Sequence, residues 1–147
     1  MSELISIMQN KYIYVPFLVW LTIQVYKVIY DSIKSKKFCW RRISGSGGMP
    51  SSHSAIVANL ATLIGKYEGV DNAMFAMSVI FAFIVMYDAC NVRQAAGKQA
   101  QVLNKIVENQ KTDEEKLTSD KLVETLGHTF FQVFVGGLIG FLVGILA

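Results

Sequence analysis

Apolar residues gather into four segments along the chain, separated by polar stretches. The segments cover residues 12–33, 50–67, 72–90 and 122–147. If residues 12–30 are helical, they extend about 28 Å, close to the thickness of the hydrocarbon core of a bilayer. The second segment is short and rich in small residues, so we expect it to pack inside a bundle. The pattern predicts an all-α fold, an integral membrane helical bundle with about four transmembrane helices.

The polar stretch between the last two segments, residues 91–121, divides into two parts. Residues 92–107 combine good helix formers with helical apolar spacing, so we expect them to prolong the third helix beyond the bilayer. Residues 111–116 carry mixed charges, which is typical of a turn. Thr118 or Ser119 would then cap the last helix.

The composition agrees with this architecture. The 147 residues suit a single domain over residues 1–147, and 52% of them are hydrophobic whereas only 17% are charged. The net charge of +3 is modest, and no basic helix interleaved with aromatic residues is present, so we expect no nucleic-acid partner. Cys39 and Cys90 match no metal-ligand spacing, and we expect no metal or other cofactor.

The distribution of lysine and arginine predicts the orientation in the membrane. Basic residues follow the first and third segments, whereas residues 66–72 contain a single lysine. The positive-inside rule therefore places the loop after the first segment and the stretch after the third in the cytoplasm. The residues concerned include Lys34, Lys36, Lys37, Arg41, Arg42, Arg93, Lys98 and Lys105.

A glycine-rich motif precedes the second segment and suggests an anion site. Glycines up to Gly47 and Gly48 free the backbone to fold closely around a ligand. Pro50 fits the first position of a helix, which would place Ser51, Ser52 and His53 in its first turn. The free N–H groups of a helix start bind anions, most often phosphate.

The chain contains two histidines, His53 and His128, and both are expected at cytoplasmic ends of helices. Two imidazoles facing one phosphate could divide the chemistry, because one can attack phosphorus while the other protonates the departing alkoxide. Gln132 lies four residues after His128, so on a helix the two would share a face. Gln132 could then accept a hydrogen bond from one ring nitrogen of His128 and orient the ring.

Several basic residues could neutralise the charge of the phosphate. We expect Arg93 and Lys98, after the third segment, and Arg41 and Arg42, before the glycine motif, to contact it. Asp88 precedes Arg93 by five residues. The carboxylate could pair with Arg93, or it could orient a histidine.

Glycines recur at every fourth position of the last segment, at Gly136, Gly140 and Gly144. This spacing lets another helix approach closely within lipid. The neighbour could be a helix of the same chain or of a second copy, so a homodimer through this glycine-lined helix is possible.

Three motifs in order resemble the divergent branch of the type-2 phosphatidic acid phosphatase and vanadium-dependent haloperoxidase superfamily. They are Gly47-Gly48-Met49-Pro50-Ser51-Ser52-His53, then Asp88-Ala89 with Arg93 and Gly97-Lys98, and then Leu126-Gly127-His128-Thr129. The resemblance implies a helical membrane bundle and metal-independent phosphoester hydrolysis through a phosphohistidine. It implies that His128 is the nucleophile, that His53 is the general acid and that Ser51 contacts phosphate.

The chain departs from the superfamily pattern at three places. Ser52 stands where the pattern has glycine, and Gln132 stands where it has the acid that orients the nucleophile. Arg93 corresponds to the motif arginine only across a long insertion. Lys36 or Lys37 with Arg41 or Arg42 would replace the first motif.

The sequence therefore predicts an integral membrane phosphatase that hydrolyses a lipid phosphate or pyrophosphate from the cytoplasmic leaflet. Two other interpretations remain open. The chain could bind a lipid phosphate, or act as a scaffold, with a degenerate phosphatase pocket and no turnover. It could also be a small transporter or channel subunit.

Overall fold

The described part of the chain is helical, without a strand. The computed structural model describes residues 2–36, 38, 48–110, 121–124 and 126–147. Its helices are α1 (Ser2–Gln9), α2 (Lys11–Ser35), α3 (Ser52–Glu68), α4 (Ala73–Tyr87), the π-helix η2 (Asp88–Val92), α5 (Arg93–Gln110) and α7 (Phe130–Leu146). The predicted all-α class is confirmed.

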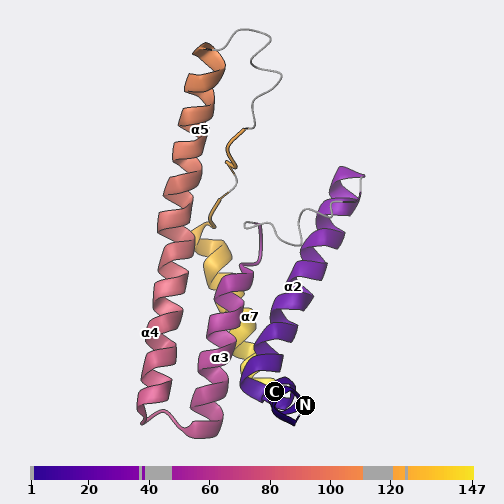
Figure 1. The fold of residues 1–147 in the computed structure, drawn as a ribbon, viewed down its shortest axis with the longest axis vertical. Coiled ribbons are helices and arrows are strands. Elements are labelled where there is room, and N and C mark those ends of the chain that lie inside the picture. Colours follow the sequence, from indigo (N-terminus) through magenta and orange to yellow (C-terminus); the bar gives the residue numbers. More distant parts are fainter. Residues whose placement is uncertain (1, 37, 39–47, 111–120, 125) are drawn as a thin grey trace.

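Helix α3 is the centre of the bundle, and it packs against α2, α4 and α7 (Figure 1). Helix α4, η2 and α5 continue one another, so residues 92–107 do prolong the third helix as predicted. Helix α5 and the end of α2 extend past the start of α3 and α7, whereas the chain termini lie at the opposite end (Figure 1).

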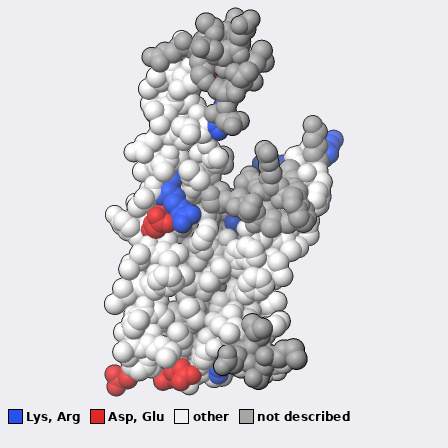
Figure 2. Space-filling model, in the orientation of Figure 1, with Lys and Arg blue, Asp and Glu red and all other residues white. Residues whose placement is uncertain are grey.

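Within the described residues, two helices are long and apolar enough to cross a membrane, over Lys11–Ser35 and Ala73–Asn109. Helices α3 and α7 have 17 residues each, or roughly 25 Å of helix. The face in Figure 2 carries charged side chains at the end where α3 meets α4 and again at the level of η2. The surface between these two levels is uncharged, as the hydrocarbon core requires.

The glycines of α7 lie against α3 of the same chain. Gly136, Gly140 and Gly144 are buried. A Cβ atom at Gly140 would meet the carbonyl oxygen of Ala55 at 2.1 Å, and one at Gly136 would meet that of Ser51 at 2.2 Å. The neighbour of these three glycines is therefore α3 of the same chain, and a homodimer through this helix stays a prediction.

Asn59 adds a hydrogen bond to the α3–α7 contact. Its side chain is fully buried, and Nδ2 donates to the carbonyl oxygen of Gly140 at 3.0 Å. A buried amide in an apolar bundle requires a partner, and the absent side chain of Gly140 exposes the carbonyl that supplies it.

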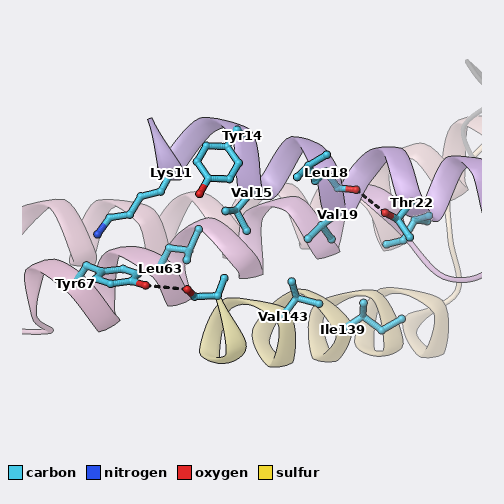
Figure 3. A pocket seen from close by; sticks show the side chains of 12 residues that line it. Lys11, Tyr14, Val15, Leu18, Val19, Thr22, Leu63, Tyr67, Ile139 and Val143 are labelled. Atoms are coloured by element: carbon cyan, nitrogen blue, oxygen red, sulfur yellow. Dashed lines mark hydrogen bonds between the residues drawn. The ribbon is translucent and has the colours of Figure 1, made fainter. Parts of the chain in front are cut away.

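Helix α2 packs on α3 through Val19 and Ile23, which contact Ala55. Near the chain termini, α2 leaves a cavity of about 480 Å³ against α3 and α7 (Figure 3). Lys11 lies at its edge, with Nζ 3.1 Å from the centroid of the Tyr67 ring. The Tyr67 hydroxyl donates to the carbonyl oxygen of Ala147 at 2.9 Å.

Two predicted helix starts are wrong by a few residues. Helix α3 is capped by Ser51, so Pro50 precedes the cap and does not occupy the first helical position. The last helix begins at Phe130 and not near residue 122, because Thr129 and Gln132 form a capping box there. Thr118 and Ser119 lie outside the described residues.

Candidate functional site

The rings of His53 and His128 meet at one end of the bundle. His53 is the second residue of α3, and His128 directly precedes Thr129, the N-cap of α7. Their ring centroids are 6.2 Å apart and the ring planes cross at 73°. The packing of α3 on α7 therefore brings the two histidines together.

The backbone of His128 is held by the π-helix and by the first turn of α5. Its N–H donates to the carbonyl oxygen of Ala89 at 2.9 Å. Gly127 has φ +86°, and a Cβ atom there would lie 2.4 Å from the backbone nitrogen of Gln94. Only glycine fits at residue 127, because the positive φ disfavours other residues and the backbone of Gln94 leaves no room for a Cβ atom.

The segment before Gly127 runs along α5. Asn104 Oδ1 accepts a hydrogen bond from the N–H of Leu122 at 3.0 Å, and Asn104 Nδ2 donates one to the carbonyl oxygen of Leu122 at 2.9 Å. A Cβ atom at Gly97 would lie 2.8 Å from the carbonyl oxygens of Glu124 and Leu126. These contacts use backbone groups that a helix would pair internally, which explains why α7 starts later than the apolar pattern predicts.

The imidazole of His128 is 2% exposed, and within the described part of the chain neither ring nitrogen has a hydrogen-bond partner. Nδ1 of the half-buried His53 is also without a partner among these residues. Buried polar atoms are normally paired. Two such rings side by side point to a polar ligand between or beside them.

Burial lowers the pKa of His128 to about 4, and the charges of Lys27, His53 and Arg93 act in the same direction. His128 is therefore neutral at pH 7, with a lone pair on one ring nitrogen. A neutral imidazole is the form that can attack an electrophile.

Two cations from different helices lie near the histidines. The charges of Lys27, from the middle of α2, and of Arg93, at the start of α5, act on both rings. Lys27 is buried. The sequence analysis missed Lys27 as a site residue, although a lysine within an apolar span is itself a signal of function.

Arg93 pairs with Asp88. Arg93 Nε lies 2.6 Å from Asp88 Oδ2, across the π-helix. Of the two alternatives for Asp88, the structure therefore contains the pairing with Arg93. Lys98 is exposed, five residues further along α5, or about 7 Å along its axis.

Ser51 joins α3 to α7 beside the histidines. Its Oγ accepts from the N–H of Ser54 at 3.4 Å and from the Ser54 hydroxyl at 2.9 Å. Its own N–H donates to the carbonyl oxygen of Gln132 at 3.1 Å. Ser51 is fully buried and Ser52 is 3% exposed, so both are part of the packing at the start of α3.

The expected hydrogen bond between Gln132 and His128 is absent. Gln132 Oε1 accepts instead from the N–H of Thr129 at 3.0 Å, and the Gln132 N–H donates to Thr129 Oγ1 at 3.3 Å. His128 lies before the helix and not within it, so the two residues do not share a helix face. Of the remaining expected residues, Gly48 is described with φ +77°, whereas Arg41, Arg42 and Gly47 lie outside the described residues.

Comparison with known proteins identifies the family. Residues 8–143 match the family described as the Divergent PAP2 family. The uncharacterized membrane protein YuiD of Bacillus subtilis (strain 168) is 46% identical over 129 residues, which cover 81% of this chain and 82% of that protein. No solved structure matches the chain. The chain is therefore a membrane protein that belongs to the divergent PAP2 family.

Proposed function

We propose that the protein is an integral membrane phosphatase that hydrolyses a lipid phosphate or pyrophosphate through a phosphohistidine. The observation that carries the proposal is the adjacent pair of buried His128 and half-buried His53, whose ring nitrogens Nδ1 and Nε2 of His128 and Nδ1 of His53 have no hydrogen-bond partner among the described residues. Membership of the divergent PAP2 family supports the same class of chemistry.

In the proposed reaction, a neutral nitrogen of His128 attacks phosphorus and the bond from phosphorus to the ester oxygen breaks. Burial lowers the pKa of His53, so in this proposal the negative charge of the bound phosphate is what favours its protonated form. His53 then gives its proton to the departing alkoxide. Water then attacks the phosphohistidine while the now neutral His53 accepts a proton from it. The phosphorus–nitrogen bond breaks, inorganic phosphate leaves, and both histidines return to their starting forms.

Cations would stabilise the charge that develops on the phosphoryl oxygens. Lys27 and Arg93 are the best candidates, because their charges already act on both imidazoles. In this proposal Gly48, before α3, Ser51 and Ser52, at its start, and Lys98, on α5, contact the phosphate or its surroundings. We also propose that Arg41, Arg42 and Gly47 contact the phosphate, because they directly precede this segment in the sequence.

We propose that the site faces the cytoplasm. Helix α5 and the end of α2 extend on the side of the histidines and carry the basic residues Lys34, Lys98 and Lys105. The turn at the other end, residues 66–72, contains a single lysine, Lys66. This distribution follows the positive-inside rule.

The direct test is release of inorganic phosphate from phosphatidic acid by the protein in detergent, without added metal. We expect His128→Ala to abolish release and His53→Ala to reduce it about 10²–10⁴-fold, the usual contribution of a general acid. A phosphorylated protein that is labile to acid should accumulate during turnover of the parent and not of His128→Ala. Release by His128→Ala at the rate of the parent would refute the nucleophile assignment.

One observation favours a second candidate, a lipid-phosphate-binding protein without turnover. Among the described residues no carboxylate bonds to either nitrogen of His128, and loss of such an orienting acid can cost about 10⁴-fold in rate. Lys27→Met should then weaken binding of phosphatidic acid in vesicles, whereas the exposed Lys34→Met on the same helix should not. Binding with this pattern, and no phosphate release under any condition, would favour the second candidate.

A further inference from the structure

We propose that the groove between α3, α4 and α7 holds the hydrocarbon chain of the lipid whose phosphate lies at His53 and His128. The inference rests on the proposed function, because it concerns the substrate of that site. In this proposal the groove selects substrates by the length of their hydrocarbon chain.

The groove has a volume of about 800 Å³ and is almost entirely apolar. Its floor is α3 and its walls are α4 and α7, with residues such as Ala61, Val79, Ala82, Val133 and Phe141 along it. Small residues on α3 and α4 make the hollow, while aromatic residues form its sides. Such a surface suits a flexible hydrocarbon chain.

One end of the groove is next to the histidines. Cys90 and Asn91 of the π-helix line it there, and the neighbouring Ala89 accepts the hydrogen bond from the backbone of His128. Phe130, the first residue of α7, lines the groove two residues after His128. A lipid with its phosphate at the histidines would therefore have its chain at the mouth of this groove.

The groove is longer than one leaflet of a bilayer. Along α4 and η2 it extends from Phe75 to Asn91, or about 24 Å at 1.5 Å per residue. A hydrocarbon core of about 30 Å leaves about 15 Å for each leaflet. A long hydrocarbon chain can therefore contact the groove over most of its length, whereas a short chain contacts only the part next to the histidines.

The cavity of about 480 Å³ between α2, α3 and α7, called the second cavity below, does not reach the histidines in this way. No residue of η2 or of the start of α7 lines it. Lys11, Tyr14 and Tyr67 line one end of it (Figure 3), and the start of α2 lies beside the chain termini (Figure 1). A substitution that fills this cavity therefore provides a matched control for one that fills the groove.

The experiment compares hydrolysis of hexyl phosphate and hexadecyl phosphate by the parent, Val79→Trp and Thr22→Trp in detergent. Val79 lies about 18 Å from the histidine end of the groove at 1.5 Å per residue, and Thr22 lines the second cavity. We expect the parent to prefer hexadecyl phosphate. We expect Val79→Trp to lower the ratio of kcat/KM for the long chain over the short one at least about tenfold, which is about 1.4 kcal/mol, and Thr22→Trp to leave it unchanged. An unchanged ratio in Val79→Trp, or equal losses in both variants, would overturn the proposal.

A second measurement does not depend on catalysis or on the folding of a variant. The parent protein is labelled with hexadecyl phosphate that carries a photoreactive diazirine in the middle of its chain. Adducts on groove residues of α3, α4 and α7 support the proposal, and adducts confined to the second cavity or to α5 overturn it. If no phosphate is released from either substrate but the adducts lie in the groove, the proposed hydrolysis fails and the chain site stands.

Discussion

The imidazole of His53 lies edge to face with that of His128, with ring centroids 6.2 Å apart. Two features of the fold create this relationship. The buried glycines of α7 let α3 approach until backbone atoms nearly touch. The π-helix, together with the turn at Gly127, then holds the segment before α7 so that His128 faces His53.

Gly127→Ala should displace His128. The substitution places a side chain at φ +86°, which costs about 1–2 kcal/mol, and it brings Cβ within 2.4 Å of the backbone of Gln94. We expect phosphate release to fall at least tenfold and the thermal midpoint in detergent to drop. Gly69→Ala is the matched control, since Gly69 has φ +85° with open space around it. Equal effects of the two substitutions on activity would contradict this account of His128.

Gly140→Ala should separate α7 from α3. Its Cβ would lie 2.1 Å from the carbonyl oxygen of Ala55, so backbone must move, and overpacking of this kind costs about 1–3 kcal/mol. The change should also weaken the hydrogen bond from Asn59 to Gly140. Thermal unfolding in detergent measures the effect.

Gly137→Ala provides the comparison within the same helix. A Cβ atom at Gly137 meets only the end of the flexible Met86 side chain, at 3.3 Å. We therefore expect little change in the thermal midpoint. A midpoint as low as that of Gly140→Ala would show that α7 tolerates no added methyl on any face.

Gln132→Glu should leave the protein as stable as the parent and no more active. The side chain belongs to the capping box with Thr129, where glutamate serves as well as glutamine and suits the positive end of a helix. It does not bond to His128, so a carboxylate there does not orient the nucleophile. Phosphate release and the thermal midpoint are measured together, and a gain in activity of tenfold or more would show that residue 132 can reach the ring.

Stability should fall as the pH is lowered from about 6.5 toward 4, in part because of His128. Its pKa is lowered from 6.5 to about 4 in the fold, so over this range the unfolded chain binds the additional proton and stability rises with pH. Each pH unit within the range contributes up to about 1.4 kcal/mol. Unfolding midpoints at pH 7.5 and pH 4.5 should differ less for His128→Gln than for the parent. The same difference in both proteins would mean that His128 does not contribute.

Local patterns were sufficient for much of the architecture. Apolar periodicity predicted the helices and the extension of the third helix, because both depend on short-range spacing. The serine and histidine motif predicted that His53 lies at a helix start, since the cap at Ser51 is made by residues three apart in sequence. The two histidines were predicted to act together from their positions at helix ends alone.

Other features depend on contacts between distant segments, and no local pattern contains them. Leu122 and Leu126 look like residues of a helix, but backbone contacts with Asn104 and Gly97 hold their segment extended along α5. The glycine stripe in α7 specifies close approach to a helix, and only the packed bundle shows that this helix is α3. Likewise, Lys27 interrupts an apolar span in the sequence, and only the packing of α2 on α3 brings its charge near enough to act on the histidines. Spacing along a chain determines which residues share a face, whereas the neighbour of that face is determined by how all the helices pack at once.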